Sequence, residues 1–290
     1  MPHNDKGDSM TRRCRRRRIA FALALPLALL FAAVPAAAQP LDPGFELRAD
    51  LFRASFDSSV RFDSADFGIG TDLDLESDLA VEDESDLVRA ELLFRTGRRS
   101  RLTIDYTAFD REGEGVVGRT FRFGDFTFRA DADVLSKTET SFAALGWRYA
   151  LVKNESSEIG LSFSVAWVDI SASIAGQVLI QGGPSFTVEE SGEASGPVPM
   201  LGLHGAWWIG DRMRISAAGR YLEIDDLDGW GGSAMDLGAR FDWFFLENLG
   251  VGGGYSVTDL EAESNDPEED GLSKAESSFD GFRVGLTVVF

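Results

Sequence analysis

The sequence contains little cysteine, little histidine and no long apolar segment beyond its first forty residues. Its 290 residues include one cysteine, Cys14, and two histidines, His3 and His204. After Gln39 no stretch approaches the roughly 20 continuous apolar residues of a membrane-spanning helix. A chain without Cys14 can have neither disulfides nor thiolate metal sites. These absences exclude a helical membrane protein and a disulfide-stabilised secreted domain.

The N-terminal segment has the composition of an export signal. The stretch "TRRCRRRRIAFALALPLALLFAAVPAAAQP" combines cationic residues, an apolar core and small residues before Gln39. This pattern predicts a secretory signal peptide at 1–38, cleaved after Ala38, with residues 39–290 as the exported domain. Cys14 leaves with the signal.

Negative charge dominates the exported part. The whole chain has a formal net charge of −20, and loss of residues 1–38 leaves 21 basic against 46 acidic residues. Nucleic-acid binding depends on neutralising phosphate with Lys and Arg. We therefore expect no nucleic-acid partner.

Apolar residues recur at every second position, which is the period of a β-strand with two different faces. Ten segments show this alternation: 45–51, 88–94, 102–108, 143–149, 159–167, 201–209, 213–221, 235–245, 249–257 and 282–290. The pattern predicts an all-β fold of about ten strands, with eight to twelve possible.

The links between these segments alternate between short and long. Short links are expected at 96–100, 152–157, 210–212 and 247–250, and longer polar links at 57–86, 112–132, 170–197, 225–233 and 259–278. An even number of antiparallel strands with this alternation is typical of a transmembrane β-barrel.

One face of the predicted strands is uncharged and ends in two aromatic belts. Phe94, Trp147, Trp207 and Trp243 precede short links, whereas Tyr106, Trp167, Tyr221 and Tyr255 lie nearer the long ones. Such belts are expected where outward side chains meet the two headgroup layers. A secreted β-sandwich is the alternative, with the uncharged face inside.

The last strand, "DGFRVGLTVVF", ends on an aromatic residue, Phe290. We expect it to pair with the first strand, near "FELRADLF", because closure removes both exposed edges. In these features the sequence resembles Gram-negative outer-membrane β-barrel proteins of the small OmpA/OmpW-like type, with no subfamily indicated. The resemblance implies an outer-membrane location and contact with lipid and lipopolysaccharide. It also implies that Phe290 is an assembly signal read by the barrel-assembly machinery.

The opposite face of the strands carries charges of both signs, which the barrel places in the lumen. The predicted lumen charge network consists of Arg48, Asp50, Arg89, Glu91, Arg95, Asp105, Arg148, Arg214, Arg220, Asp236, Arg240, Asp242 and Arg283. Paired Arg and carboxylate groups would fill the interior as a polar plug. A narrow gated pore is the alternative, because lumen-side Gly and Ser, as in "GVGGGYS", leave room on one wall.

Catalysis would have to use His204, the single histidine after residue 38. Its inferred hairpin neighbour is Ser216 or Ala217, and a serine within reach of a histidine is a minimal nucleophile arrangement. Barrel lipases and lipid A deacylases resemble one another in placing these groups toward the outer leaflet, whereas His204 lies near a short turn. In the ten-stranded omptin proteases an Asp stands two residues before the His, a place that Gly202 occupies here. We therefore expect a structural histidine and no enzymatic activity.

An acidic loop between the first two strands carries the remaining candidate site. Asp72, Asp74, Glu76 and Asp78 would align along one edge of an extended segment. Hard cations such as Ca²⁺ or Mg²⁺ prefer several oxygen ligands of this kind, although the EF-hand pattern is absent. A hydrated acidic loop is the alternative. The second loop, at 119–131, predicts a small hairpin that either covers the mouth or adds two strands to the barrel.

Taken together, the sequence predicts a non-enzymatic outer-membrane barrel with a packed polar lumen and acidic external loops. Its role would be envelope integrity or surface interaction. A narrow passive channel for small solutes or cations is the alternative, and a lipid-modifying enzyme is a more distant one. We expect no cofactor apart from a cation on the acidic loop.

Overall fold

The computed structural model describes residues 43–63, 71–116, 121–123, 126–128, 133–179, 185–227, 230–264 and 271–290. The expected cleavage point after Ala38 lies outside these residues.

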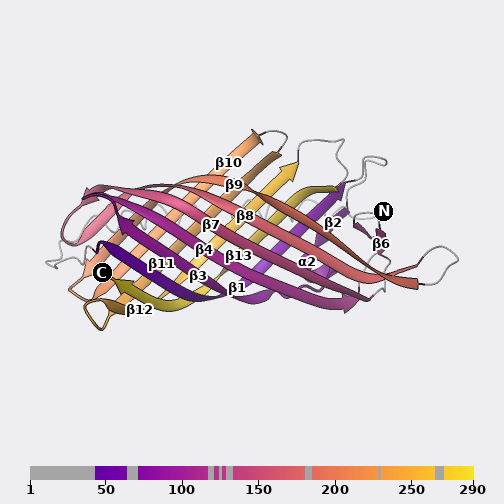
Figure 1. Ribbon diagram of the computed structural model, residues 1–290, viewed down its shortest axis with the longest axis horizontal. Helices are drawn as coiled ribbons and strands as arrows, with labels where there is room; N and C mark the ends of the chain where they lie inside the picture. Colours follow the sequence, from indigo (N-terminus) through magenta and orange to yellow (C-terminus); the bar gives the residue numbers. More distant parts are fainter. Residues whose placement is uncertain are drawn as a thin grey trace, which may run out of the picture.

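Ten long strands form one closed antiparallel barrel, as the alternation predicts (Figure 1). They are β1 (Phe45–Asp63), β3 (Glu84–Arg95), β4 (Ser100–Val116), β7 (Asp133–Lys153), β8 (Ser157–Leu179), β9 (Ser185–Ile209), β10 (Met213–Leu227), β11 (Trp230–Phe244), β12 (Leu249–Ser264) and β13 (Gly271–Val289). Each strand pairs with its neighbour in the chain, and β13 pairs with β1 from Val289 opposite Glu46 to Gly271 opposite Asp63. The predicted closure between first and last strands is confirmed.

The four short turns fall where the sequence predicts them, at one end of the barrel. This end, here called the turn end, also holds the C-terminus (Figure 1). In the turn between β9 and β10, Gly210 has a φ of 64°, a left-handed conformation that glycine adopts without a steric penalty. The opposite end is called the loop end.

At the loop end, a short segment fills a gap in the barrel wall. The strand β3 is shorter than its neighbours, and β2 (Thr71–Asp74) pairs with β1 beyond the point where β3 ends. The helix α2 (Leu75–Asp78) follows, and Val81 then bridges to Gly113 of β4. Leu73, Leu79 and Val81 are buried. The first predicted loop is therefore partly built into the wall.

The second predicted loop contains the expected hairpin. Its strands β5 (Phe121–Phe123) and β6 (Phe126–Phe128) pair with each other in a separate two-stranded sheet. They add no strands to the barrel. Among the described helices none has the length and hydropathy needed to cross a membrane.

Several strands continue far into segments that the sequence predicts as loops. The strands β8 and β9 have 23 and 25 residues, whereas a transmembrane strand needs about 9–11. The expected long link at 170–197 is wrong, since most of it is a β8–β9 ladder. The barrel therefore extends well past the thickness of a membrane.

The extension has the opposite arrangement of apolar and polar faces. Near the turn end of β4, Asp105 points inward and Tyr106 outward, but farther along Phe109 is buried inside and Asp110 is exposed. The strand β1 changes in the same way, with Phe56 buried inside and Asp57 exposed. This inversion explains why the upper strand segments resemble loops in the sequence.

A belt of exposed apolar side chains surrounds the turn-end half of the barrel. It includes Leu51, Val88, Ile104, Leu145, Leu161, Leu201, Phe241, Val284 and Leu286. At its two edges lie exposed aromatic residues, Phe94, Trp147 and Trp243 on one side and Tyr106, Trp167, Tyr221 and Tyr255 on the other. Apolar area of this extent on an outer surface indicates a membrane-facing band.

Candidate functional site in the barrel lumen

The inward side chains form successive layers along the barrel axis. From the turn end, β1 presents Glu46, Arg48 and Asp50, and then Phe52 and Phe56. The strand β11 runs in the opposite direction to β1. Its buried Ala234 lies in the upper part, and its buried Arg240, Asp242 and Phe244 follow toward the turn end. The lumen therefore has a lower ionic part and an upper apolar part.

An apolar cluster closes the turn end. Trp208, Phe244 and Val289 pack together, with the rings of Trp208 and Phe244 5.6 Å apart. The Arg214 guanidinium lies over both rings, at 5.1 and 5.3 Å from their centroids. These contacts link the end of the barrel to the ionic layer above it.

The first ionic layer centres on Asp242, which is fully buried. Its carboxylate accepts hydrogen bonds from Arg214 at 2.8 Å and from Arg240 at 2.6 Å. Arg214 also binds Glu46 through two hydrogen bonds of 2.6 and 2.9 Å, and Arg240 binds Asp50. Buried charges need such pairing to offset their desolvation.

Glycines on β12 make room for these guanidinium groups. A Cβ at Gly252 would collide with Arg240 and Asp242, and one at Gly254 would lie 3.1 Å from Nε of Arg283. The "GVGGGYS" stretch therefore accommodates arginine side chains on this wall of the lumen.

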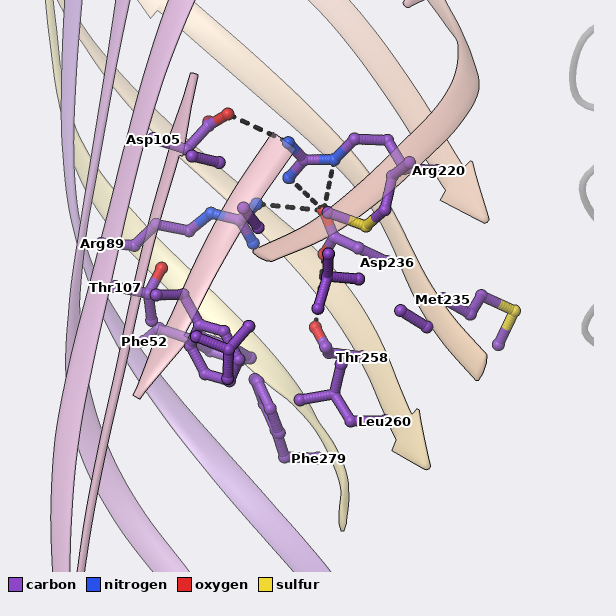
Figure 2. Close-up of a pocket in the computed structure, with 17 residues that line it drawn as sticks. Phe52, Arg89, Asp105, Thr107, Arg220, Met235, Asp236, Thr258, Leu260 and Phe279 are labelled. Atoms are coloured by element: carbon purple, nitrogen blue, oxygen red, sulfur yellow. Dashed lines mark hydrogen bonds and ion pairs between the residues drawn. The ribbon is translucent and has the colours of Figure 1, made fainter. Parts of the chain in front are cut away.

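A second ionic layer lies above the first and is shared by four strands. Figure 2 shows Arg89 and Arg220 converging on Asp236, at 3.2 and 2.5 Å, while Arg220 also binds Asp105 at 3.0 Å. Between the layers, Glu91 accepts from Arg48 at 2.7 Å and from Arg148 at 2.5 Å.

Above the ionic layers the lumen is filled by aromatic rings. Phe279 lies 5.4 Å from Phe56 and 5.5 Å from Phe109, and Phe52 and Phe142 complete the group. On the opposite wall Met200 packs with small and branched residues, Ala144, Ala166, Ala234, Val168, Val198, Leu222 and Leu260. The upper lumen is therefore filled mainly by apolar side chains.

Within the part of the lumen that the structure describes lie two small cavities. The upper one, of about 60 Å³, lies between the aromatic layer and the second ionic layer (Figure 2). The lower one, of about 80 Å³, lies on the turn-end side. Both are lined by Arg89, Asp105, Arg220 and Asp236, so these four side chains separate the cavities.

Near the loop end, Arg111 connects the wall segment to the lumen. It binds Glu76 of α2 at 2.6 Å and Ser58 at 3.0 Å, and its guanidinium lies 4.3 Å from the Phe56 centroid. Glu76 also accepts from the Ser58 amide at 2.9 Å. These bonds hold α2 against the inner wall.

Twelve of the thirteen residues expected in the lumen network form ion pairs with one another or with Glu46. The thirteenth, Arg95, lies outside this group, at the exposed end of β3. Sequence reasoning missed Glu46, which the same alternation places two residues before Arg48. It also missed Arg111, because the predicted strand at 102–108 ends before this residue, whereas β4 continues to Val116.

The acidic residues of the first loop do not lie along one extended edge. Asp74 caps α2 by accepting from the Ser77 amide at 2.7 Å, and Asp78 accepts from the Asp74 amide at 3.0 Å. The side chain of Asp72 lies outside the described residues. Asp57, Asp74 and Glu76 each bring one carboxylate oxygen within 4.8 Å of the others. Since Glu76 is bound to Arg111, this group is at least partly an internal ion-pair site.

His204 is buried in the lower lumen, opposite Gly160 and Ala218. Its Nε2 lies 3.4 Å from a Glu158 oxygen. Ser216, an expected neighbour, is instead opposite Ala206.

Phe290 closes the barrel at the turn end. Its amide donates to the Phe45 carbonyl at 2.9 Å, and its carbonyl accepts from the Phe45 amide at 3.1 Å. The Phe290 side chain is 71% exposed and faces outward.

No family model and no curated protein matches this sequence. Among solved structures, the outer membrane protease OmpT from Escherichia coli is 9% identical, with a TM-score of 0.57 over 90% of this chain and 100% of that one. The Pseudomonas putida toluene transporter TodX is also 9% identical, with a TM-score of 0.34 over 88% and 93%. Neisserial surface protein A is 11% identical, with a TM-score of 0.29 over 85% and 97%.

Of these three likenesses, the one to OmpT has a TM-score above 0.5, and at 9% identity it concerns the fold alone. It agrees with the closed antiparallel sheet, the outer apolar band and the pairing of β1 with β13. The chain has the ten-stranded fold of the Gram-negative outer-membrane β-barrel proteins.

Proposed function

We propose that this chain is an integral outer-membrane barrel that does not conduct and that serves envelope integrity or surface interaction. The observation that carries the proposal is the filled lumen, in which an apolar cluster, two ionic layers and an aromatic layer follow one another. Side chains fill small barrels of this kind, whereas aqueous porins use about sixteen strands.

Export through the predicted signal and recognition of Phe290 by the assembly machinery belong to the same proposal. The exposed apolar band would contact lipid, and the outward acidic residues beyond it, such as Asp110 and Glu139, would lie at the lipopolysaccharide headgroups. Catalysis is not part of the proposal, because the residue directly opposite His204 on β10 is Ala218, a side chain without a nucleophile.

A narrow gated channel is the second candidate. The two cavities favour it, because they share Arg89, Asp105, Arg220 and Asp236 as lining side chains. Movement of a few paired side chains would join the two spaces into a longer path.

Single-channel recording of refolded residues 39–290 in planar bilayers distinguishes the two candidates. The closed barrel predicts a silent bilayer with protein whose folding is confirmed by heat-modifiable migration on a gel. Steady, saturable openings would overturn the closed barrel. An Asp236→Asn variant that raises their frequency would assign the gate to the second ionic layer.

A further inference from the structure

The ionic part of the lumen contains one more cation than anions. Seven arginines meet there: Arg48, Arg89, Arg148, Arg214, Arg220, Arg240 and Arg283. The carboxylates within 4 Å of these arginines, in the part of the chain that the structure describes, belong to Glu46, Asp50, Glu91, Asp105, Asp236 and Asp242. Six negative charges therefore face seven positive ones.

Arg283 accounts for the difference. Its nearest carboxylate belongs to Asp50, at 3.9 Å, and Asp50 already binds Arg240. Within the described residues Nε of Arg283 has no hydrogen-bond partner, and the side chain is only 12% exposed. A buried charge without close compensation is strongly unfavourable.

Arg283 and Ser256 line the lower cavity together. The guanidinium lies against glycines on two strands, since a Cβ at Gly238 would come 3.2 Å from it and one at Gly254 would come 3.1 Å from its Nε. Ser256 is 1% exposed, and its hydroxyl also has no hydrogen-bond partner among the described residues. Two buried donors thus line the same cavity of about 80 Å³.

The carboxylates of this cavity are already shared. Glu91 is bound by two arginines, and so is Asp236. The other two acids that line the cavity are also paired, Asp105 with Arg220 and Glu158 with Arg101 and Lys153. These acids therefore do not supply the charge that Arg283 lacks.

We propose that the lower cavity binds a small inorganic anion through Arg283 and Ser256. The anion would balance the odd guanidinium and accept hydrogen bonds from Nε and from the Ser256 hydroxyl. The volume of the cavity allows a halide or a small oxyanion and excludes larger organic anions. The inference does not depend on whether the barrel conducts.

The test is urea unfolding of refolded residues 39–290 in detergent micelles, in sodium chloride, sodium sulfate or sodium gluconate of equal ionic strength. We expect the unfolding midpoint of the wild type to rise and saturate with chloride or sulfate, but not with gluconate. Arg283→Gln should abolish the saturable rise and be at least as stable as wild type in gluconate. Arg53→Gln, which changes an outward arginine with a 71% exposed side chain, should keep the wild-type response.

Two outcomes would overturn the proposal. One is a wild-type midpoint with the same dependence on all three salts. The other is an Arg283→Gln variant destabilised equally in each salt, because Arg283 would then be balanced by the protein itself or by water.

A second variant keeps the test valid if Arg283→Gln does not fold. Ser256→Ala removes a hydroxyl that has no hydrogen-bond partner among the described residues. This change should leave stability in gluconate unchanged, while weakening anion affinity roughly tenfold or more. Crystals grown in bromide should show anomalous scattering beside Arg283. Its absence at saturating bromide, or an unchanged affinity of Ser256→Ala, would contradict the assigned site.

Discussion

The lower and upper parts of this barrel are built from the same ten strands but with opposite arrangements of their faces. In the lower part Asp105 and Arg214 are buried and apolar residues such as Leu51 and Ile104 face outward. In the upper part Phe56 and Phe109 fill the interior and Asp110 faces outward. The residue type on the outward face of one strand therefore depends on the surrounding medium. Lipid favours apolar outward residues, and water favours polar ones.

The largest expected effect comes from breaking the lower part at its most buried acid. Asp242→Ala leaves Arg214 and Arg240 without a shared partner, and we expect a loss of about 3–5 kcal/mol in the free energy of unfolding. Urea unfolding in micelles measures this loss. Replacing Arg214 and Asp242 together by apolar residues should cost less than the single change, because Glu46 keeps Arg48 and Arg240 keeps Asp50. A loss below about 1 kcal/mol for Asp242→Ala would show that the network is not needed for stability.

In the upper part, we expect a substitution to lower stability by creating a cavity, not by leaving a charge uncompensated. Phe279→Ala removes the ring that contacts Phe56 and Phe109, and we expect a loss of about 3 kcal/mol in the same measurement. Phe282→Ala on the same strand is the matched control, because Phe282 is 76% exposed on the outer face. Equal losses for the two variants would contradict the assignment of inner and outer faces.

A smaller, local effect is expected where the wall segment meets the upper interior. Glu76→Gln weakens the bond to Arg111, so residues 75–82 should exchange amide hydrogens roughly tenfold faster, while global stability changes little. The control is Glu82→Gln, since the Glu82 side chain is exposed. Unchanged exchange in Glu76→Gln would mean that the buried leucines alone hold the segment.

The smallest expected effect concerns Lys274, which lies on β13 in the extension beyond the apolar band. Burial lowers the pKa of Lys274, but its hydrogen bonds with Glu276 and Glu261 outweigh burial and raise this pKa above the ordinary value. A raised folded-state pKa stabilises at neutral pH, and this contribution is lost as pH rises through that pKa. We therefore expect Lys274→Met to cost less than about 0.5 kcal/mol at pH 8 and nothing at pH values above the raised pKa. A difference that grows with pH would refute the assigned ion pairs.

Alternation predicts the number of strands, the short turns and most inward charges because these depend on local periodicity and turn chemistry. Its limit is the change of solvent along a strand. The segments around Phe56, Phe109 and Phe279 keep the period of two but reverse its sense, so a rule based on apolar outward residues ends each strand there. Local periodicity also cannot predict which charged residues pair with each other. Arg240 on β11 binds Asp50 on β1, and these strands come close only when the barrel closes. The excess of one arginine becomes visible only when all these pairs are known.

The pairing of β1 with β13 has a consequence for the order of folding. Hydrogen bonds between Phe45 and Phe290 join the first and last strands of the chain, which are neighbours in the barrel. No shorter N-terminal portion of the chain can therefore complete the cylinder. Until β13 arrives, β1 and the growing end both expose unpaired backbone groups. Because this seam pairs residues so far apart in sequence, we expect it to form late and slowly, and a partner that holds the open edge of β1 would act before it forms.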